Sequence, residues 1–213
     1  MKRVLAFDFG ASSGRAILAS YDRGTLQYRE IHRFENIPVE INGQLTWNFD
    51  ALMANVFQGI QKAGDFHSIA FDTWGVDFGL LDEKGHLLGN PVHYRDRRTE
   101  RITEQAFQKL SPEQLYRATG NQIMPINTLF QLLALQQQQP DIWKKTRRLL
   151  FMPDLFAYAL CGTQVCETTI ASTSQMLDPQ SKTWNKTVLD AFGLPSSLFA
   201  PSVPSATVVG EYR

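Results

Sequence analysis

The sequence predicts an α/β fold with a mixed central sheet, and three observations support this fold class. Residues 4–8, 15–21 and 26–34 each predict a strand, and apolar and polar residues roughly alternate in the last of them. Short turns separate these segments, so we expect an antiparallel meander, because parallel neighbours need a longer crossover. A helix with one apolar face follows, and residues 68–71 then predict a strand that re-enters the sheet in the parallel direction.

Capping and stop residues delimit the next elements. Asp50 is expected to cap a helix that ends at Gly64. The apolar face of this helix is formed by Leu52, Met53, Val56, Phe57 and Ile60. Residues 68–89 predict a hairpin-like unit with one bend at Gly75 and another at residues 83–85.

The pattern becomes helical beyond residue 98. Ser111 is expected to begin a helix through a capping box with Pro112 at the first helical position, and Gly120 to end it. Further helices are predicted over residues 129–139, 152–160 and 184–192. Residues 194–213 are rich in proline and serine and have the composition of a linker.

Composition excludes several classes of function. Hydrophobic residues make up 43% of the chain, which is enough for a core, and Lys+Arg and Asp+Glu both total 21. This balance provides no overall field to attract nucleic acid or an anionic membrane. No apolar run approaches the ~20 residues of a membrane span, so we expect a cytoplasmic protein. Cys161 and Cys166 have no matching His or Cys group, which indicates neither a metal site nor a disulfide framework.

The stretch "AFDFGASSGRAI", residues 6–17, has the residue types of a phosphate-binding loop between two strands. Phosphate needs several N–H donors, and glycine lets the backbone come close to it. The candidate donors are the backbone around Gly10 and Gly14, the hydroxyls of Ser12 and Ser13, and the guanidinium of Arg15. Asp8, at the end of the strand, suits a water-mediated contact with Mg²⁺.

This loop differs from the best-known phosphate motifs. It has no Gly-Lys-Ser/Thr, and a strand rather than a helix follows it, so it is neither a P-loop nor a dinucleotide fingerprint. A tight β-hairpin whose small residues serve only the turn remains an equal alternative at this point.

A second bend lies in "FDTWGVDFGLLD", residues 71–82. A carbohydrate site needs acceptors for hydroxyl groups, an apolar wall and bare backbone, and Asp77, Trp74 and Gly75 could supply these. The alternative is a structural hairpin in which the aspartates cap the turn and the tryptophan belongs to the core.

The order strand, Asp-x-Gly loop, strand, strand, helix, strand resembles the half-domain of the actin, Hsp70 and sugar-kinase superfamily, which has the ribonuclease-H-like fold. This resemblance implies a mixed central sheet flanked by helices. In that superfamily the hairpin between the first two strands grips the nucleotide phosphates.

A closer resemblance runs along nearly the whole chain. The stretches "DFGASSGRAILASYD", "FDTWGVDFGLLDEKG", "PVHYRDRRT", "LLFMPDLFAYALCG" and "ASTSQMLD" resemble the rhamnulokinases of the FGGY family of carbohydrate kinases. The resemblance implies an ATP-binding loop made of Ala11, Ser12, Ser13, Gly14 and Arg15. It also implies that Asp8 lies beside the metal and the phosphates, and that Gly75 and Asp77 contact the sugar. Tyr94, Arg95 and Asp96 match a family segment near the sugar, but a structural ion pair there is an equal alternative.

The resemblance further implies that residues 1–213 are the N-terminal domain of a two-domain kinase. The family's catalytic aspartate would lie beyond Arg213, in a C-terminal domain that this chain lacks, so we expect residues 1–213 alone to be inactive. The complete enzyme would use ATP and Mg²⁺ to phosphorylate L-rhamnulose at its 1-hydroxyl. Two alternatives are an FGGY kinase for another ketose or polyol and a non-catalytic, actin-like nucleotide-binding module.

Overall fold

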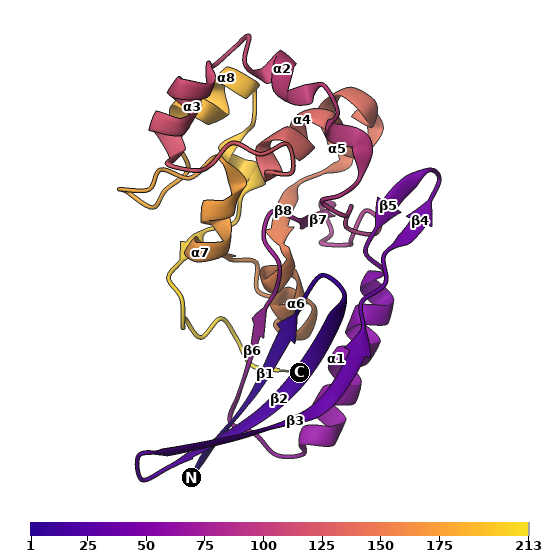
Figure 1. The fold of residues 1–213 in the computed structure, drawn as a ribbon, viewed down its shortest axis with the longest axis vertical. Helices are drawn as coiled ribbons and strands as arrows, with labels where there is room; N and C mark the ends of the chain where they lie inside the picture. The colour runs from indigo at the N-terminus through magenta and orange to yellow at the C-terminus, as the bar shows by residue number, and fades with distance from the viewer. Residues whose placement is uncertain (213) are drawn as a thin grey trace. The chain divides into compact units, whose positions relative to one another are not determined.

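The computed structural model describes residues 1–212, which form two compact units (Figure 1). Unit 1 comprises Met1–Val39 and Trp47–Trp74. Unit 2 comprises Glu40–Thr46 and the chain from Gly75 onward. Of the two predicted site segments, the loop of residues 10–15 belongs to unit 1. The bend at residues 74–77 has Trp74 in unit 1 and Gly75 onward in unit 2.

Unit 1 is built on a sheet of four strands in the order β3-β2-β1-β6 (Figure 1). The strands are β1 (Lys2–Phe9), β2 (Ser13–Asp22), β3 (Thr25–Glu35) and β6 (Ser68–Asp72). β1 pairs antiparallel with β2, β2 pairs antiparallel with β3, and β6 lies parallel to β1. The predicted meander, the parallel return and the mixed sheet are therefore confirmed.

Helix α1 (Phe49–Ala63) connects the meander to β6 and packs against β1, β2 and β3. A β-carbon at Gly59 would lie 2.6 Å from the Phe7 ring, so this glycine lets the helix approach the sheet closely. Two predictions for this helix were wrong. The side chain of Asn48, not of Asp50, caps it by accepting the Ala51 N–H at 3.0 Å. Phe57 is 49% exposed, because the helix contacts the sheet through the side that carries Gly59, and Phe57 lies outside that side.

Unit 2 contains three small two-stranded sheets. They are the pairs β4 (Val39–Ile41) with β5 (Gln44–Thr46), β7 (Phe78–Leu81) with β8 (Arg148–Phe151), and β9 (Cys166–Glu167) with β10 (Ser202–Val203). The prediction of one hairpin over residues 68–89 was wrong at its first bend, because β6 pairs with β1 whereas β7 pairs with β8. Its second bend is a hairpin turn, with a bridge between Leu81 and Leu87.

The rest of unit 2 is helical. Its longer helices are α3 (Pro112–Thr119), α4 (Thr128–Gln138), α6 (Met152–Cys161) and α8 (Lys186–Phe192). The shorter ones are η1 (Arg97–Thr99), α2 (Ile102–Ala106), α5 (Pro140–Lys145), α7 (Thr168–Ala171), η2 (Ser172–Ser174) and η3 (Ser196–Leu198). Ser111 forms the predicted capping box with Gln114, and Gly120 ends α3 in a left-handed conformation.

The core of unit 2 lies between its helices and β7–β8, where Phe130, Phe151 and Phe156 have no exposed surface. The linker interpretation of residues 194–213 was wrong for the first part of that segment. Leu198 and Phe199 are buried, because the apolar residues among the prolines and serines pack into this core. Cys161 and Cys166 are free thiols, and Cys166 is buried.

Candidate functional site

The first candidate segment is the loop of residues 10–15 between β1 and β2. The Gly10 N–H donates to the Ser13 carbonyl at 2.9 Å, which closes a tight turn. Asn36 holds this turn from the end of β3. Its backbone N–H donates to the Ser12 carbonyl at 3.0 Å, and its Nδ2 donates to the Gly10 carbonyl at 2.9 Å. The carbonyl groups of Gly10, Ser12 and Ser13 are thus bonded within the protein.

The opposite face of the loop offers unused donors. Within residues 1–212, neither the N–H groups of Ala11 and Ser12 nor the hydroxyls of Ser12 and Ser13 have a hydrogen-bond partner. Ala11 and Ser12 are exposed, and Ser13 is partly exposed. Two backbone donors and two hydroxyls are therefore available to an anionic ligand.

Gly14 meets a packing requirement that we did not predict. A β-carbon at this position would lie 2.1 Å from Cζ of Phe34, and the residue is buried. The Phe34 ring in turn contacts Phe9 edge-on, with the ring centroids 5.4 Å apart. Gly14 thus allows an aromatic ring to lie directly on the strand that leaves the loop.

Two acidic residues and one arginine lie next to the loop. Nε of Arg15 donates to the Asp8 carboxylate at 2.8 Å. Asp72, at the end of β6, stands beside Asp8 in the parallel register, so both carboxylates occupy the same edge of the sheet. Mg²⁺ is commonly held by one or two carboxylates together with water and substrate phosphates, so this pair fits that ion. Among residues 1–212 no group of three or more His, Cys, Asp or Glu side chains could hold a metal by itself.

The second candidate segment contains a strained turn at Val76. The Asp77 N–H donates to the Gly75 carbonyl at 2.9 Å, and Val76 between them has a φ of 66°. An i→i+2 hydrogen bond across a residue of positive φ defines the rare, strained form of the γ-turn. A β-branched residue in this region costs on the order of 1–3 kcal/mol and persists only where its surroundings impose it.

Three side chains from elsewhere in unit 2 impose this conformation. The Val76 N–H donates to Oγ1 of Thr173 at 3.1 Å, and the Val76 carbonyl accepts the Thr128 hydroxyl at 2.7 Å. Nε2 of Gln131 lies 3.3 Å from the same carbonyl. Thr173 also limits the space at Gly75, where a β-carbon would lie 3.1 Å from Cγ2 of the threonine.

The Asp77 side chain is directed into the interior of unit 2 and has no exposed surface. One carboxylate oxygen accepts the Tyr94 N–H at 3.1 Å, and the other accepts Nε2 of Gln131 at 3.0 Å. These bonds tie the turn to α4 and to the segment before η1. They give Asp77 a positioning role, and its direct contact with a sugar stays a prediction.

The support of the turn continues into α6. The Met152 N–H at the start of this helix donates to the Asp77 carbonyl at 3.2 Å. In the same turn of helix, Asp154 is buried and accepts the Glu167 N–H at 3.2 Å. Burial raises the pKa of Asp154 to about 7, more than the Glu167 N–H lowers it. Glu167 caps α7, which leads to Thr173.

The remaining predicted residues occupy different environments. In unit 1, Trp74 is partly exposed and packs against the fully buried Trp47, with the ring centroids 3.9 Å apart and the ring planes tilted by 31°. In unit 2, the Asp96 carboxylate accepts the N–H groups of Leu45 and Arg98, which makes it a capping residue. The guanidinium of Arg95 lies 5.4 Å from the centroid of the Tyr94 ring. The Asp96 carboxylate therefore accepts backbone hydrogen bonds in place of the ion pair that was one of the two alternatives.

The sequence of this chain matches a family profile over almost its whole length. The profile describes the N-terminal domain of the FGGY family of carbohydrate kinases, and the match covers residues 3–213. The chain belongs to the FGGY family of carbohydrate kinases.

Two similar members of this FGGY family are rhamnulokinases. The rhamnulokinase of Klebsiella pneumoniae (strain 342) is 38% identical over 218 aligned residues, which cover 100% of this chain and 45% of the relative. The rhamnulokinase of Halalkalibacterium halodurans is 41% identical over 203 residues, which cover 93% of this chain and 43% of the relative. The chain thus spans a little under half the length of these relatives.

Solved FGGY kinase structures share the fold. Ligand-bound xylulose kinase from Lactobacillus acidophilus superposes with a TM-score of 0.85 at 20% identity, over 100% of this chain and 44% of that protein. Plasmodium falciparum glycerol kinase with ADP superposes with a TM-score of 0.83 at 16% identity, over 100% of this chain and 45% of that protein. The predicted actin-like, ribonuclease-H-like fold class is confirmed. Among residues 1–212, no helix has the length and apolar character to span a membrane.

Sequence reasoning missed four residues that shape the two segments of this FGGY domain: Asn36, Thr128, Gln131 and Thr173. Asn36 had a weak local signal, because a buried asparagine directly after a strand is typical of a residue that holds a turn. The other three act on Val76 over 52 to 97 positions of sequence. No local pattern identifies such partners.

Proposed function

We propose that this chain is the N-terminal domain of an ATP-dependent kinase that phosphorylates L-rhamnulose at its 1-hydroxyl. The observation that carries the proposal is the identity of 38–41% to rhamnulokinases along all or nearly all of the chain. The solved neighbours are 16–20% identical and bear on the fold alone.

In this proposal the first loop binds the phosphates of ATP. The unused donors of Ala11, Ser12 and Ser13 support this role, since phosphate oxygens accept several hydrogen bonds at once. Gly14 keeps the loop in register with β2, and Arg15 adds a cation that nucleotide phosphates can recruit from its pair with Asp8.

Asp8 and Asp72 would hold Mg²⁺ through its water ligands. The ion supplies neutralising charge for the phosphate oxygens when it is bound. The protein's own contribution is to keep two carboxylates side by side at the ends of β1 and β6.

For the sugar, we propose contacts from Trp74 and Gly75. Trp74 offers an aromatic face that is held in place by Trp47, and Gly75 offers backbone without a side chain. Asp77 is retained as a sugar-site residue that acts through the turn it holds.

The reaction breaks the bond between the γ-phosphorus and the bridging oxygen, and ADP leaves. A new bond forms to the 1-hydroxyl oxygen of the sugar, which gives up its proton to a base. We propose that a C-terminal domain supplies this base and the rest of the ATP site, and that residues 1–213 alone lack turnover. Positioning and charge stabilisation dominate such transfers. We place the reaction in the cytoplasm, where ATP is available.

The test uses the longest reading frame that carries this chain and measures ADP release with L-rhamnulose, other ketoses and glycerol. We expect the highest kcat/KM with L-rhamnulose. A higher value for another acceptor would contradict the substrate assignment, and no acceptor-dependent ADP release at all would contradict the kinase proposal.

A matched pair of variants tests the ATP loop. Arg15→Ala is expected to raise the KM for ATP by roughly tenfold, because it removes one charge-assisted contact. Arg23→Ala removes an exposed arginine from the turn between β2 and β3 and should leave the KM unchanged. Equal effects of the two substitutions would remove the loop from the ATP site.

A further inference from the structure

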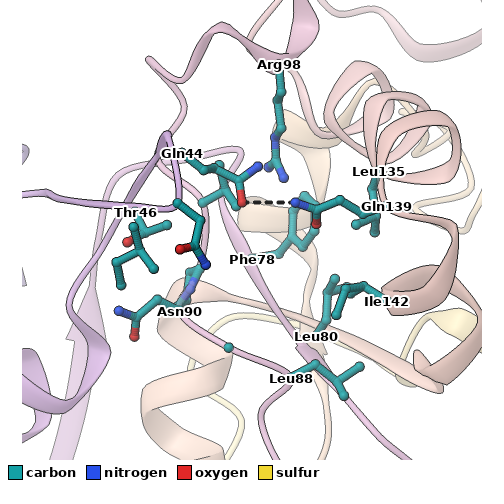
Figure 2. Close-up of a pocket in the computed structure, with 15 residues that line it drawn as sticks. Gln44, Thr46, Phe78, Leu80, Leu88, Asn90, Arg98, Leu135, Gln139 and Ile142 are labelled. Carbon is teal, nitrogen blue, oxygen red and sulfur yellow. Dashed lines mark hydrogen bonds between the residues drawn. The ribbon is translucent and has the colours of Figure 1, made fainter.

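A cavity of about 270 Å³ lies within unit 2, and its lining includes none of the residues proposed above to contact ATP or the sugar (Figure 2). Its walls come from the β4–β5 hairpin, from β7, from residues 88–92, and from the junction of α4 with α5. A volume of this size is close to the lower end of small-molecule sites in proteins. It has room for a ligand of a few carbon atoms.

Arg98 is the cationic side chain of this cavity. Its Nη2 donates to Oε1 of Gln131, and its guanidinium lies 5.8 Å from the centroid of the Phe78 ring. Figure 2 shows the side chain pointing toward the hydrogen bond between Gln44 and Gln139. These contacts fix the orientation of the guanidinium on two sides.

The other donors of Arg98 are unused. Within residues 1–212, Nε and Nη1 have no hydrogen-bond partner. Among the described residues, Nε1 of Trp184 is the one side-chain polar atom that is both fully buried and without a hydrogen-bond partner. Nε and Nη1 of Arg98 also have no partner, so they are not fully buried. Arg98 lines the cavity, where a free N–H of its guanidinium can donate a charge-assisted hydrogen bond to a carboxylate.

The charge around Arg98 limits the ligand. Burial lowers the pKa of Arg98 to about 10, while Asp77 and Asp96 act in the opposite direction. The guanidinium is therefore charged at neutral pH, but two carboxylates already lie within its field. Each negative charge on a ligand is attracted by Arg98 and repelled by Asp77 and Asp96, so a singly charged anion meets less repulsion than a phosphate dianion.

The remaining lining is both polar and apolar. Gln139 donates to Gln44 at 3.3 Å across the cavity, and Asn90 lies on the same rim. These amides can give up the long hydrogen bond between them and instead form hydrogen bonds with the hydroxyl groups of a ligand. Leu80 and Leu135 contribute to an apolar wall, which suits a carbon backbone.

We propose that this cavity binds a small hydroxylated monocarboxylate, whose carboxylate pairs with Arg98 and whose hydroxyl groups bond to the amides of Gln44 and Gln139. The proposal does not rest on the kinase reaction, and it stands whether or not the protein phosphorylates L-rhamnulose.

The test is isothermal titration calorimetry of the full protein that carries this chain, with D-glycerate as the probe. Glycerol is the neutral counterpart, and inorganic phosphate, titrated at pH 8.5, is the doubly charged one. We expect a millimolar dissociation constant for D-glycerate and no heat of binding with glycerol. Absence of D-glycerate binding, or tighter binding of phosphate than of D-glycerate, would overturn the proposal.

Variants place the binding in this cavity. Arg98→Gln should weaken D-glycerate binding by about tenfold or more. Arg97→Gln, at the exposed neighbouring arginine, should leave it unchanged. Because Arg98→Gln also removes the bond to Gln131, Leu88→Trp provides a second variant that fills the cavity and leaves Arg98 in place. Retention of full binding by Leu88→Trp would overturn the proposal whatever the Arg98 variant does.

Discussion

The two bends of this domain are stabilised in opposite ways. The loop of residues 10–15 is exposed at its tip, at Ala11 and Ser12, and its six residues have no positive φ angle. Its shape depends on two glycines and on one neighbour, Asn36. The turn at Val76 is buried, contains a β-branched residue with a φ of 66°, and depends on three distant side chains.

The conformation of the loop is determined mainly by its own residues, whereas the conformation of the turn is determined by tertiary contacts. A loop whose conformation suits its own residues keeps its free N–H groups facing solvent. A strained turn persists only while α4 and η2 hold it, so its geometry is as stable as the surrounding packing. We therefore expect perturbations of the core to alter the turn at Val76 before they alter the loop of residues 10–15.

The largest expected effect concerns pH and the helix that supports the turn. The pKa of Asp154 is about 7 in the folded protein against 3.8 for the ordinary group, so folding favours the protonated carboxyl. This contribution is fully present below pH 4 and is lost as the pH rises through 7. It amounts to roughly 4 kcal/mol at most.

Asp154→Asn should therefore gain stability relative to the wild type between pH 4 and pH 8, as measured by urea unfolding at each pH. The comparison cancels the titration of the other carboxylates. Asp141→Asn, at an exposed position, should show a flat difference over the same range. A flat difference for Asp154→Asn as well would show that this carboxyl is ionised in the folded protein.

The next effect tests the loop of residues 10–15. Gly14→Ala should destabilise the protein by about 3 kcal/mol, because the new β-carbon would overlap the Phe34 ring. Gly10→Ala should cost less, since its β-carbon would lie 3.2 Å from the Ser13 carbonyl oxygen. Thermal unfolding measures both.

Phe34→Ala supplies the control for that clash. Combined with Gly14→Ala it should recover part of the loss, because the overlapping ring is gone. If the double variant were as unstable as the sum of the single ones, the conflict at Gly14 would lie elsewhere.

A smaller effect is expected from the clamp on Val76. Thr173→Val keeps the shape of the side chain but leaves the Val76 N–H without its acceptor, at a cost of about 1–2 kcal/mol. In the kinase assay, the KM for the sugar should rise while the KM for ATP stays constant. Thr173→Ser retains the hydroxyl and should restore the sugar KM, and failure of serine to do so would separate Thr173 from the sugar site.

The smallest effect is expected at Asn36. Asn36→Leu keeps a similar side-chain size but removes the Nδ2–H donor to the Gly10 carbonyl, which costs about 1 kcal/mol. The backbone bond from Asn36 to Ser12 remains, so we expect a modest rise in the KM for ATP and none for the sugar. A rise confined to the sugar KM would contradict the assignment of the loop.

The sequence predicted the elements that carry their own signals. Strand-like residue patterns gave the strands of the meander, and the Ser111–Gln114 capping box and Gly120 bounded α3 as expected. The loop of residues 10–15 could be recognised because its glycines and serines stand next to one another. The family resemblance depended on the same contiguous stretches.

Predictions failed where a tertiary contact decided the outcome. The close approach at Gly59 moved Phe57 to the surface, and the separate pairing of β6 and β7 broke the expected hairpin at Gly75. The hydrogen bonds of the Asp77 carboxylate with Gln131 and the Tyr94 N–H were likewise not predicted, and its contact with a sugar stays a prediction.

The division into two units affects how this domain can change during evolution. The backbone passes from one unit to the other after Val39, after Thr46 and again after Trp74. A single recombination crossover or a single protease cut therefore cannot release either unit intact. The two units must therefore be inherited, exchanged and degraded together, although unit 1 carries the loop of residues 10–15 and unit 2 carries the turn at Val76.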